Sequence, residues 1–247
     1  MNAELLEVEV YETRQEMGAA AAGRIAAAIR QLIADRGRAV GLFASAPSQS
    51  DTLAALIREP GIDWSRVTAF HLDEYLGFDE NHPQSFRRFL REHLLSRVPV
   101  GIFHGLGGEA ADAGKECARY AALLRGNPPD FAVIGIGENG HLAFNDPAVC
   151  DFRDPLAVKV VELDEECRWQ QVHDGAFASF EEVPKRALSL TVPQITSAGK
   201  IFVAVPGARK KAAVAAALHG PVVTTCPASI LRTHPNACLF LDRDSAS

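Results

Sequence analysis

The chain has 247 residues, 47% of them hydrophobic, and a formal net charge of −6, which suits one large globular domain. The acidic balance argues against a nucleic-acid surface, and no apolar run approaches the roughly 18 residues that a membrane span needs. The five cysteines are scattered and never spaced C-x-x-C, which favours reduced thiols over disulfides or a zinc site, and the acidic N-terminus lacks the features of a signal peptide. We therefore expect residues 1–247 to form a single cytoplasmic, metal-free domain without nucleic-acid or membrane partners.

Patterns typical of helices and strands alternate along the chain. Residues 13–34 predict a helix, because apolar residues recur at helical spacing and Thr13 with Glu16 can form a capping box. In chain order, the remaining predicted elements are a strand over 38–44, a helix over 51–57, a strand over 67–72, a helix over 83–97, a strand over 101–106, a helix over 109–124, strands over 131–136, 157–163, 187–192 and 200–205, a helix over 208–218 and a strand over 237–242. This alternation indicates an α/β fold in three layers, with a mostly parallel sheet flanked by helices.

Residues 146–184 are the least regular and most highly charged part of the sequence. Two interpretations are open for this segment. It follows directly on the most polar loop of the chain, which favours a flap that closes over a site. Its composition alone is equally typical of a surface excursion without function.

The stretch from Asp130 to Pro147 carries most of the chemistry. Its apolar run predicts a strand buried on both faces, and glycines then turn the backbone where polar residues gather. Ligands of open α/β sheets bind beyond the carboxyl ends of the strands. The polar residues placed there are Glu138, Asn139, His141, Asn145 and Asp146.

The same stretch contains a G-x-G-x-x-G pattern from Gly135 to Gly140. A dinucleotide site also needs a helix that opens at the third glycine and an acidic residue about twenty positions further on. Here Pro147 argues against a helix through the following residues. We therefore expect no nicotinamide cofactor.

Residues at the ends of three other predicted strands could also take part. Asp73 follows the strand over 67–72 and is either a turn aspartate or a general base. Lys210 begins a predicted helix, where a cation opposes the helix dipole unless a bound anion compensates, although a solvated lysine is an equal alternative. The hydroxyls of Ser45 and Ser48 lie where phosphate is often bound, but their loop has no glycine.

Three motifs resemble those of the glucosamine-6-phosphate deaminases. They are His71-Leu-Asp-Glu-Tyr75, the stretch from Gly135 to Pro147, and Leu231-Arg-Thr-His-Pro235. The family belongs to a group that shares a Rossmann-like fold with ribose-5-phosphate isomerase and 6-phosphogluconolactonase. The resemblance covers about residues 38–242 in order.

The resemblance implies a deaminating aldose–ketose isomerase, a hydrolase and isomerase in one, that converts glucosamine-6-phosphate to fructose-6-phosphate and ammonia without a cofactor. It implies that Asp73 moves a proton between C2 and C1 and that His141, oriented by Asp146, opens the sugar ring. The phosphate would be held by a larger set: Lys210, Arg168, and the loop residues Ser45, Ala46 and Ser48.

The sequence departs from the family pattern at several positions. Asn139, with Glu138 beside it, stands where many members carry aspartate, so either residue could fill that role, and we expect Asn139→Asp to be tolerated. Alternatives are a lactonase or another phosphosugar isomerase, and a non-catalytic sugar-phosphate-binding protein. The partner in each reading is a small sugar phosphate, and assembly into a homo-oligomer stays open.

Overall fold

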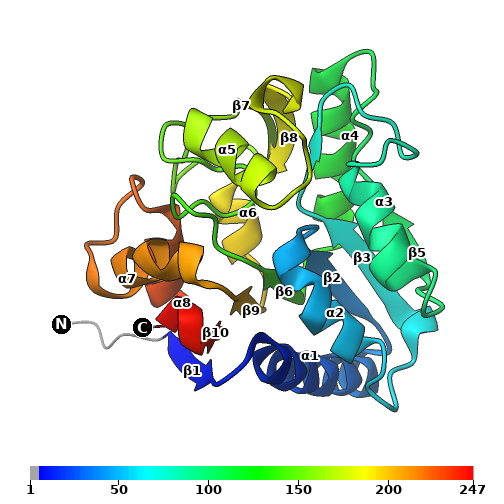
Figure 1. Ribbon diagram of the computed structural model, residues 1–247. Coiled ribbons are helices and arrows are strands. Elements are labelled where there is room, and N and C mark those ends of the chain that lie inside the picture. The colour runs from blue at the N-terminus through cyan, green and yellow to red at the C-terminus, as the bar shows by residue number, and fades with distance from the viewer. Residues whose placement is uncertain (1–5, 247) are drawn as a thin grey trace.

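The computed structural model describes residues 6–246, which form two sheets surrounded by helices (Figure 1). The larger sheet has seven strands in the order β1-β10-β9-β6-β2-β3-β5, and every pair of neighbours is parallel. Its strands are β1 (Glu7–Tyr11), β2 (Ala39–Phe43), β3 (Val67–His71), β5 (Ile102–His104), β6 (Phe131–Ile134), β9 (Lys200–Val205) and β10 (Ala237–Asp242). The predicted α/β fold with a mostly parallel sheet is confirmed.

Helices cover both faces of this sheet. The helices are α1 (Arg14–Arg36), α2 (Ser50–Leu56), α3 (Phe86–Leu90) with a π-helical turn at Arg91–Leu95, α4 (Ala113–Gly126), α5 (Glu165–His173), α6 (Val192–Thr196), α7 (Lys211–His219) and α8 (Arg243–Ala246). Helices α1 and α2 pack on one face together with the α3 region, and α4, α6 and α7 pack on the other. In residues 6–246, no helix is both long and apolar enough to cross a membrane.

The alternation of side chains along the central strands builds the two cores. In β6, Phe131 and Val133 face α1, whereas Ala132 and Ile134 face α4 and α7. Successive side chains of a strand point to opposite faces, so a strand covered on both sides must be apolar throughout. This requirement explains why β6 and its neighbours read as continuous hydrophobic runs in the sequence.

The smaller sheet corrects part of the predicted topology. Strands β7 (Val158–Glu162) and β8 (Arg186–Leu190) do not join the parallel sheet, but pair antiparallel with each other, and β8 also pairs with β4 (Asp73–Tyr75) in the order β4-β8-β7. Their inner residues contribute to a core that includes Tyr75 and Phe144. This sheet lies next to α5, far from α1, in Figure 1.

Several elements differ from the sequence-based expectation, among them β4, α6 and α8, which were not predicted. The edge strand β1 and the helix α5 were not predicted, and α5 lies inside the segment expected to be irregular. The helix predicted over 83–97 begins only after Ser85, whose side chain caps it, and changes to π-helical geometry at Arg91. The helix predicted over 109–124 begins after Asp112, which caps α4. The capping box of Thr13 and Glu16 is confirmed.

Candidate active site

A cavity of about 250 Å³ opens at the carboxyl ends of the adjacent strands β9, β6, β2 and β3. Carboxyl ends of parallel strands meet at one edge of the sheet, so segments distant in the sequence converge there. The residues predicted from the sequence that line the cavity are Ser45, Ala46, Ser48, Asp73, His141 and Lys210. Six predicted residues from four loops are thus brought together.

Asp73 lies where the chain leaves β3 and enters β4, and only 7% of its surface is exposed. Burial, and secondarily the neighbouring charge of Glu74, raise the pKa of Asp73 well above its ordinary value. A general base works best when its pKa approaches the working pH. The position therefore gives Asp73 the properties of a carboxylate that can both take up and return a proton.

His141, which lines the same cavity as Asp73, pairs with Asp146, which is completely buried and does not itself line the cavity. The imidazole Nδ1 lies 3.0 Å from Asp146 Oδ1. Burial alone would raise the pKa of Asp146, but the interactions with His141, Asn139 and the Asp164 amide outweigh it and hold that pKa below its usual value. The ring lies over Gly137, where a Cβ would approach His141 Cε1 to 2.2 Å, so glycine is required there.

Asn139 does not contact the imidazole ring. Its Oδ1 accepts the backbone N–H of His141, and its Nδ2 donates to Asp146 Oδ1 at 3.1 Å and to Asp164 Oδ2 at 3.0 Å. The amide therefore separates two carboxylates that would otherwise repel each other. An aspartate at this position would add a third negative charge, which argues against tolerance of Asn139→Asp, and the expected tolerance stays a prediction to be tested.

Lys210 supplies the cation of the cavity. It is 6% exposed and lies in the last turn before α7. Burial lowers the pKa of Lys210, and the nearby Asp174 and Glu138 oppose this effect. The buried Ser45 Oγ has no hydrogen-bond partner within residues 6–246, so this hydroxyl is free to bind a polar ligand group.

Arg168 and Glu138 do not line this cavity. The Arg168 guanidinium donates to the carbonyl oxygens of Phe180 and Val183 and stacks over the Phe180 ring at 3.8 Å. Glu138 Oε2 faces His173 Nδ1 at 3.3 Å. The predicted phosphate contact of Arg168 and the predicted role of Glu138 at the histidine find no support in these contacts.

Helix α5 contributes two cavity residues that the sequence analysis missed, Gln170 and Gln171, and the C-cap residue Asp174 contributes a third. Gln170 Oε1 accepts the backbone N–H of Glu138, and Gln171 Oε1 accepts the Tyr75 hydroxyl. A signal for this helix was present, because Asp164 caps it and acidic residues follow in its first turn.

In the described part of the chain, one cluster at the site consists of side chains of the kinds that bind metal ions. The ligand atoms of His141, Asp146 and Cys167 lie within 4.8 Å of one another. However, His141 and Asp146 already face each other, and burial raises the pKa of Cys167, which keeps its thiol protonated. The expectation that the chemistry needs no metal stays a prediction.

The comparisons with known proteins agree with this geometry. The sequence model of the family described as glucosamine-6-phosphate isomerases/6-phosphogluconolactonase matches residues 12–240. A glucosamine-6-phosphate deaminase of Listeria monocytogenes serotype 4a (strain HCC23) is 37% identical over 200 residues, covering 81% of this chain and 83% of the relative. The corresponding deaminase of Bacillus cereus (strain G9842) is 35% identical over 193 residues, covering 78% of this chain and 72% of the relative.

Solved structures show the same fold. A monomeric glucosamine-6-phosphate deaminase superposes with a TM-score of 0.90 at 28% identity, covering 97% of this chain and 98% of that one. A 6-phosphogluconolactonase of Shewanella baltica OS155 has a TM-score of 0.79 at 20% identity, covering 96% of this chain and 97% of that one. With a family match over most of its length, the chain belongs to the glucosamine-6-phosphate isomerase/6-phosphogluconolactonase family.

Proposed function

We propose that the protein is a glucosamine-6-phosphate deaminase, which converts glucosamine-6-phosphate and water to fructose-6-phosphate and ammonia. The observation that carries this proposal is that Asp73, His141 and Lys210 line one cavity. A base, an acid–base imidazole and an anion-binding cation are the three groups that the reaction requires. The Listeria and Bacillus relatives, which carry the same name, support the choice of substrate.

Each group has a role that matches its surroundings. His141, held by Asp146, transfers the proton of the C1 hydroxyl to the ring oxygen, so that the bond between C1 and the ring oxygen breaks and the open-chain aldehyde forms. Asp73 removes the proton from C2 and returns it to C1, which moves the unsaturation to the carbon that bears nitrogen. Water then adds at C2 and ammonia leaves, so this last step is formally a hydrolysis. Lys210 binds the phosphate, and its partial burial strengthens that attraction.

The cavity contacts also bear on the alternative activities. Structures of 6-phosphogluconolactonases share the fold at about 20% identity, which supports the architecture and not the reaction. A protein that only binds sugar phosphates would gain nothing from burying Asp73, because an unpaired buried carboxylate costs stability. The deaminase reaction, by contrast, uses the buried carboxylate of Asp73 as its base. We also propose that the enzyme works in the cytoplasm, where sugar phosphates such as its proposed substrate are metabolised.

The decisive experiment is incubation of the purified protein with glucosamine-6-phosphate, with coupled assays for ammonia and for fructose-6-phosphate. We expect both products in equal amounts. Hydrolysis of 6-phosphogluconolactone without ammonia release from the amino sugar would identify a lactonase instead. Calorimetric binding of glucosamine-6-phosphate without any product would identify a non-catalytic binding protein.

A further inference from the structure

Glu74 follows the proposed base directly, but its side chain is completely buried and does not line the cavity. Its carboxylate accepts five hydrogen bonds, each 2.8–3.2 Å long. The donors are Tyr75 N, Ser85 Oγ, Phe86 N, Arg87 N and Arg87 Nε. A surface turn would not need such a set, and no step of the proposed reaction uses this carboxylate.

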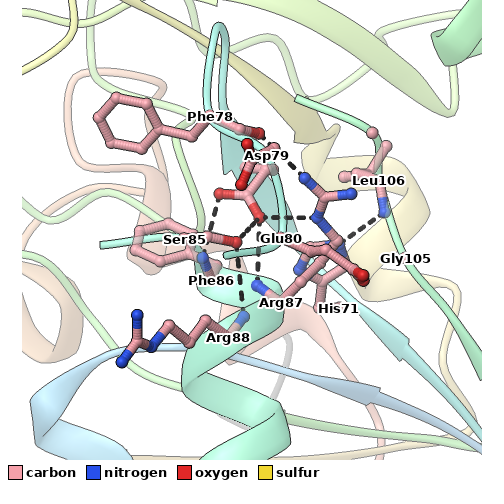
Figure 2. Close-up of polar contacts among 12 residues, drawn as sticks. His71, Phe78, Asp79, Glu80, Ser85, Phe86, Arg87, Arg88, Gly105 and Leu106 are labelled. Atoms are coloured by element: carbon pink, nitrogen blue, oxygen red, sulfur yellow. Dashed lines mark hydrogen bonds and ion pairs between the residues drawn. The ribbon is translucent and has the colours of Figure 1, made fainter. Parts of the chain in front are cut away.

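The donors of Glu74 belong to the segment that forms one wall of the cavity. Ser85 and Phe86 line the cavity, as do the neighbouring residues Pro83 and Gln84. Figure 2 shows Ser85, Phe86 and Arg87 gathered at the start of α3, where the dashed lines converge. Because the first backbone N–H groups of a helix have no intrahelical partner, a carboxylate is a strong anchor at this point. Glu74 thus joins the wall to the strand that carries Asp73.

Arg87 balances the buried charge of Glu74 and extends the network outwards. Its Nε lies 3.2 Å from Glu74 Oε2, and its Nη2 lies 2.6 Å from Glu109 Oε2. The loop bearing Glu109 packs closely here, since a Cβ at Gly108 would lie 2.2 Å from Tyr75 O. Glu109 itself is about half-exposed, with 48% of its side chain accessible, and its side-chain hydrogen bonds within residues 6–246 come from Arg87 rather than from the wall. The buried and exposed ends of the network can therefore be tested separately.

We propose that Glu74 is a positioning residue of the enzyme, which fixes the Pro83–Phe86 wall relative to Asp73 and keeps a negative charge behind that base. The proposal rests on the proposed function, because it assigns Asp73 to proton transfer. The two effects have different signatures. Displacing the wall weakens substrate binding, whereas removing the charge alters the protonation of Asp73.

The direction of the second effect follows from the charges. Burial is the main cause that raises the pKa of Asp73, and the negative charge of Glu74 is the second cause. Arg87 contacts Glu74, and burial raises the pKa of Glu74 itself. On the other side, the charge of Asp73 acts on Tyr75, Tyr120 and Cys167, and His141 and Lys210 line the same cavity as Asp73. Since the base must be ionised, activity rises with pH through the pKa of Asp73. Loss of the Glu74 charge should therefore move the acidic limb of the kcat/KM profile to lower pH.

The test compares Glu74→Gln with Glu74→Asp and with the matched control Glu109→Gln. Every hydrogen-bond partner of the Glu74 carboxylate is a donor. In Glu74→Gln the amide nitrogen, itself a donor, would face one of these donors, so the hydrogen bonds that hold the wall would be lost. For Glu74→Gln we expect a KM for glucosamine-6-phosphate raised about 10-fold, together with an acidic limb at lower pH. Glu74→Asp keeps the charge but is one methylene shorter, so its KM should rise while its acidic limb stays. Glu109→Gln should match the wild type in both.

An unchanged KM and an unchanged acidic limb in Glu74→Gln would overturn the proposal, as would Glu109→Gln reproducing the effects of Glu74→Gln. If Glu74→Gln shows no cooperative melting, Glu74→Asp decides, because an unchanged KM there contradicts a positioning role. Absence of wild-type turnover would count against the proposed function alone. Calorimetric affinities of Glu74→Asp and Glu109→Gln for glucosamine-6-phosphate would still test the position of the wall.

Discussion

At the scale of single residues, Asp73 is the group on which the proposed reaction depends most directly. Asp73→Asn keeps the size of the side chain but removes the base, so kcat should fall by about 10²–10⁴-fold, the range for loss of general-base catalysis. KM should change little, because the proposed phosphate-binding residues lie on other loops. Steady-state kinetics measure both values, with the exposed Asp35→Asn as a control. Turnover close to the wild-type value would remove Asp73 from the mechanism.

Asn139 shows how a single amide keeps neighbouring charges apart. In Asn139→Asp, three carboxylates would converge and two donated hydrogen bonds would be lost, which should cost about 1–3 kcal/mol of folding stability. Crowded carboxylates have raised pKa values in the folded state, so the cost should be complete at neutral pH and should shrink as the pH falls through those values. Thermal unfolding at pH 7 and pH 5 measures the difference.

Asn139→Ala provides the matched control, because it removes the same hydrogen bonds without adding a charge. Its loss of stability should be nearly the same at both pH values. A pH-independent deficit for Asn139→Asp as well would show that lost hydrogen bonds, and not repulsion, account for its effect.

At the scale of elements, the sequence predicted those parts whose signal is local. The strands around β6 are apolar on both faces, and the glycines after them mark the turn that carries His141. By contrast, β8, the antiparallel partner of β4, lies more than a hundred residues further along the chain, and no local pattern distinguishes it from a parallel strand. Helix α5 was missed because its polar surface hides the helical period, although Asp164 marked its start.

The site residues likewise divide into those whose position follows from local sequence and those whose position depends on packing. Asp73, His141 and Lys210 lie in the connections that follow the carboxyl ends of β3, β6 and β9, so the topology places them in the cavity. Arg168 stands on α5, and the direction of a helical side chain depends on how that helix packs. The structure turns Arg168 towards Phe180 and turns Gln171 towards the cavity, which no single sequence could have specified.

Arg168 donates to backbone carbonyl groups, whereas Lys210 lines the cavity, so substitutions of these two cations should have different effects. Arg168→Met leaves the carbonyl groups of Phe180 and Val183 without their donor, so it should lower stability by about 1–3 kcal/mol. It should affect phosphate affinity only weakly. Lys210→Met should weaken binding of glucosamine-6-phosphate by about 1.5–3 kcal/mol and should not weaken binding of unphosphorylated glucosamine.

Calorimetry and thermal unfolding of both variants measure these quantities side by side. A selective loss of phosphorylated ligand in a stably folded Arg168→Met would restore Arg168 to the phosphate site. Equal losses for both ligands in Lys210→Met would show that the lysine acts on structure.

At the scale of the whole molecule, the carboxyl ends of the parallel strands hold two buried carboxylates, Asp73 and Asp146. The effect on stability depends on the direction of each pKa shift. Asp73 has a raised pKa in the folded state, so its ionisation opposes folding above the ordinary carboxyl pKa of about 3.9. Asp146 has a lowered pKa, so its ionisation favours folding, and this contribution is lost as the pH falls through the folded value.

The two aspartates should therefore respond to the same substitution with opposite signs. At pH 7, Asp73→Asn should raise Tm, by about 2–4 °C for each kcal/mol recovered in a chain of this size, although it abolishes most turnover. The gain should vanish near pH 4, where the unfolded carboxyl is itself protonated. Asp146→Asn should lower Tm at pH 7 and approach the wild type under acidic conditions. Scanning calorimetry from pH 4 to pH 8 measures both curves, and a Tm of Asp73→Asn below that of the wild type at pH 7 would mean that the ionised Asp73 is stabilised by its surroundings.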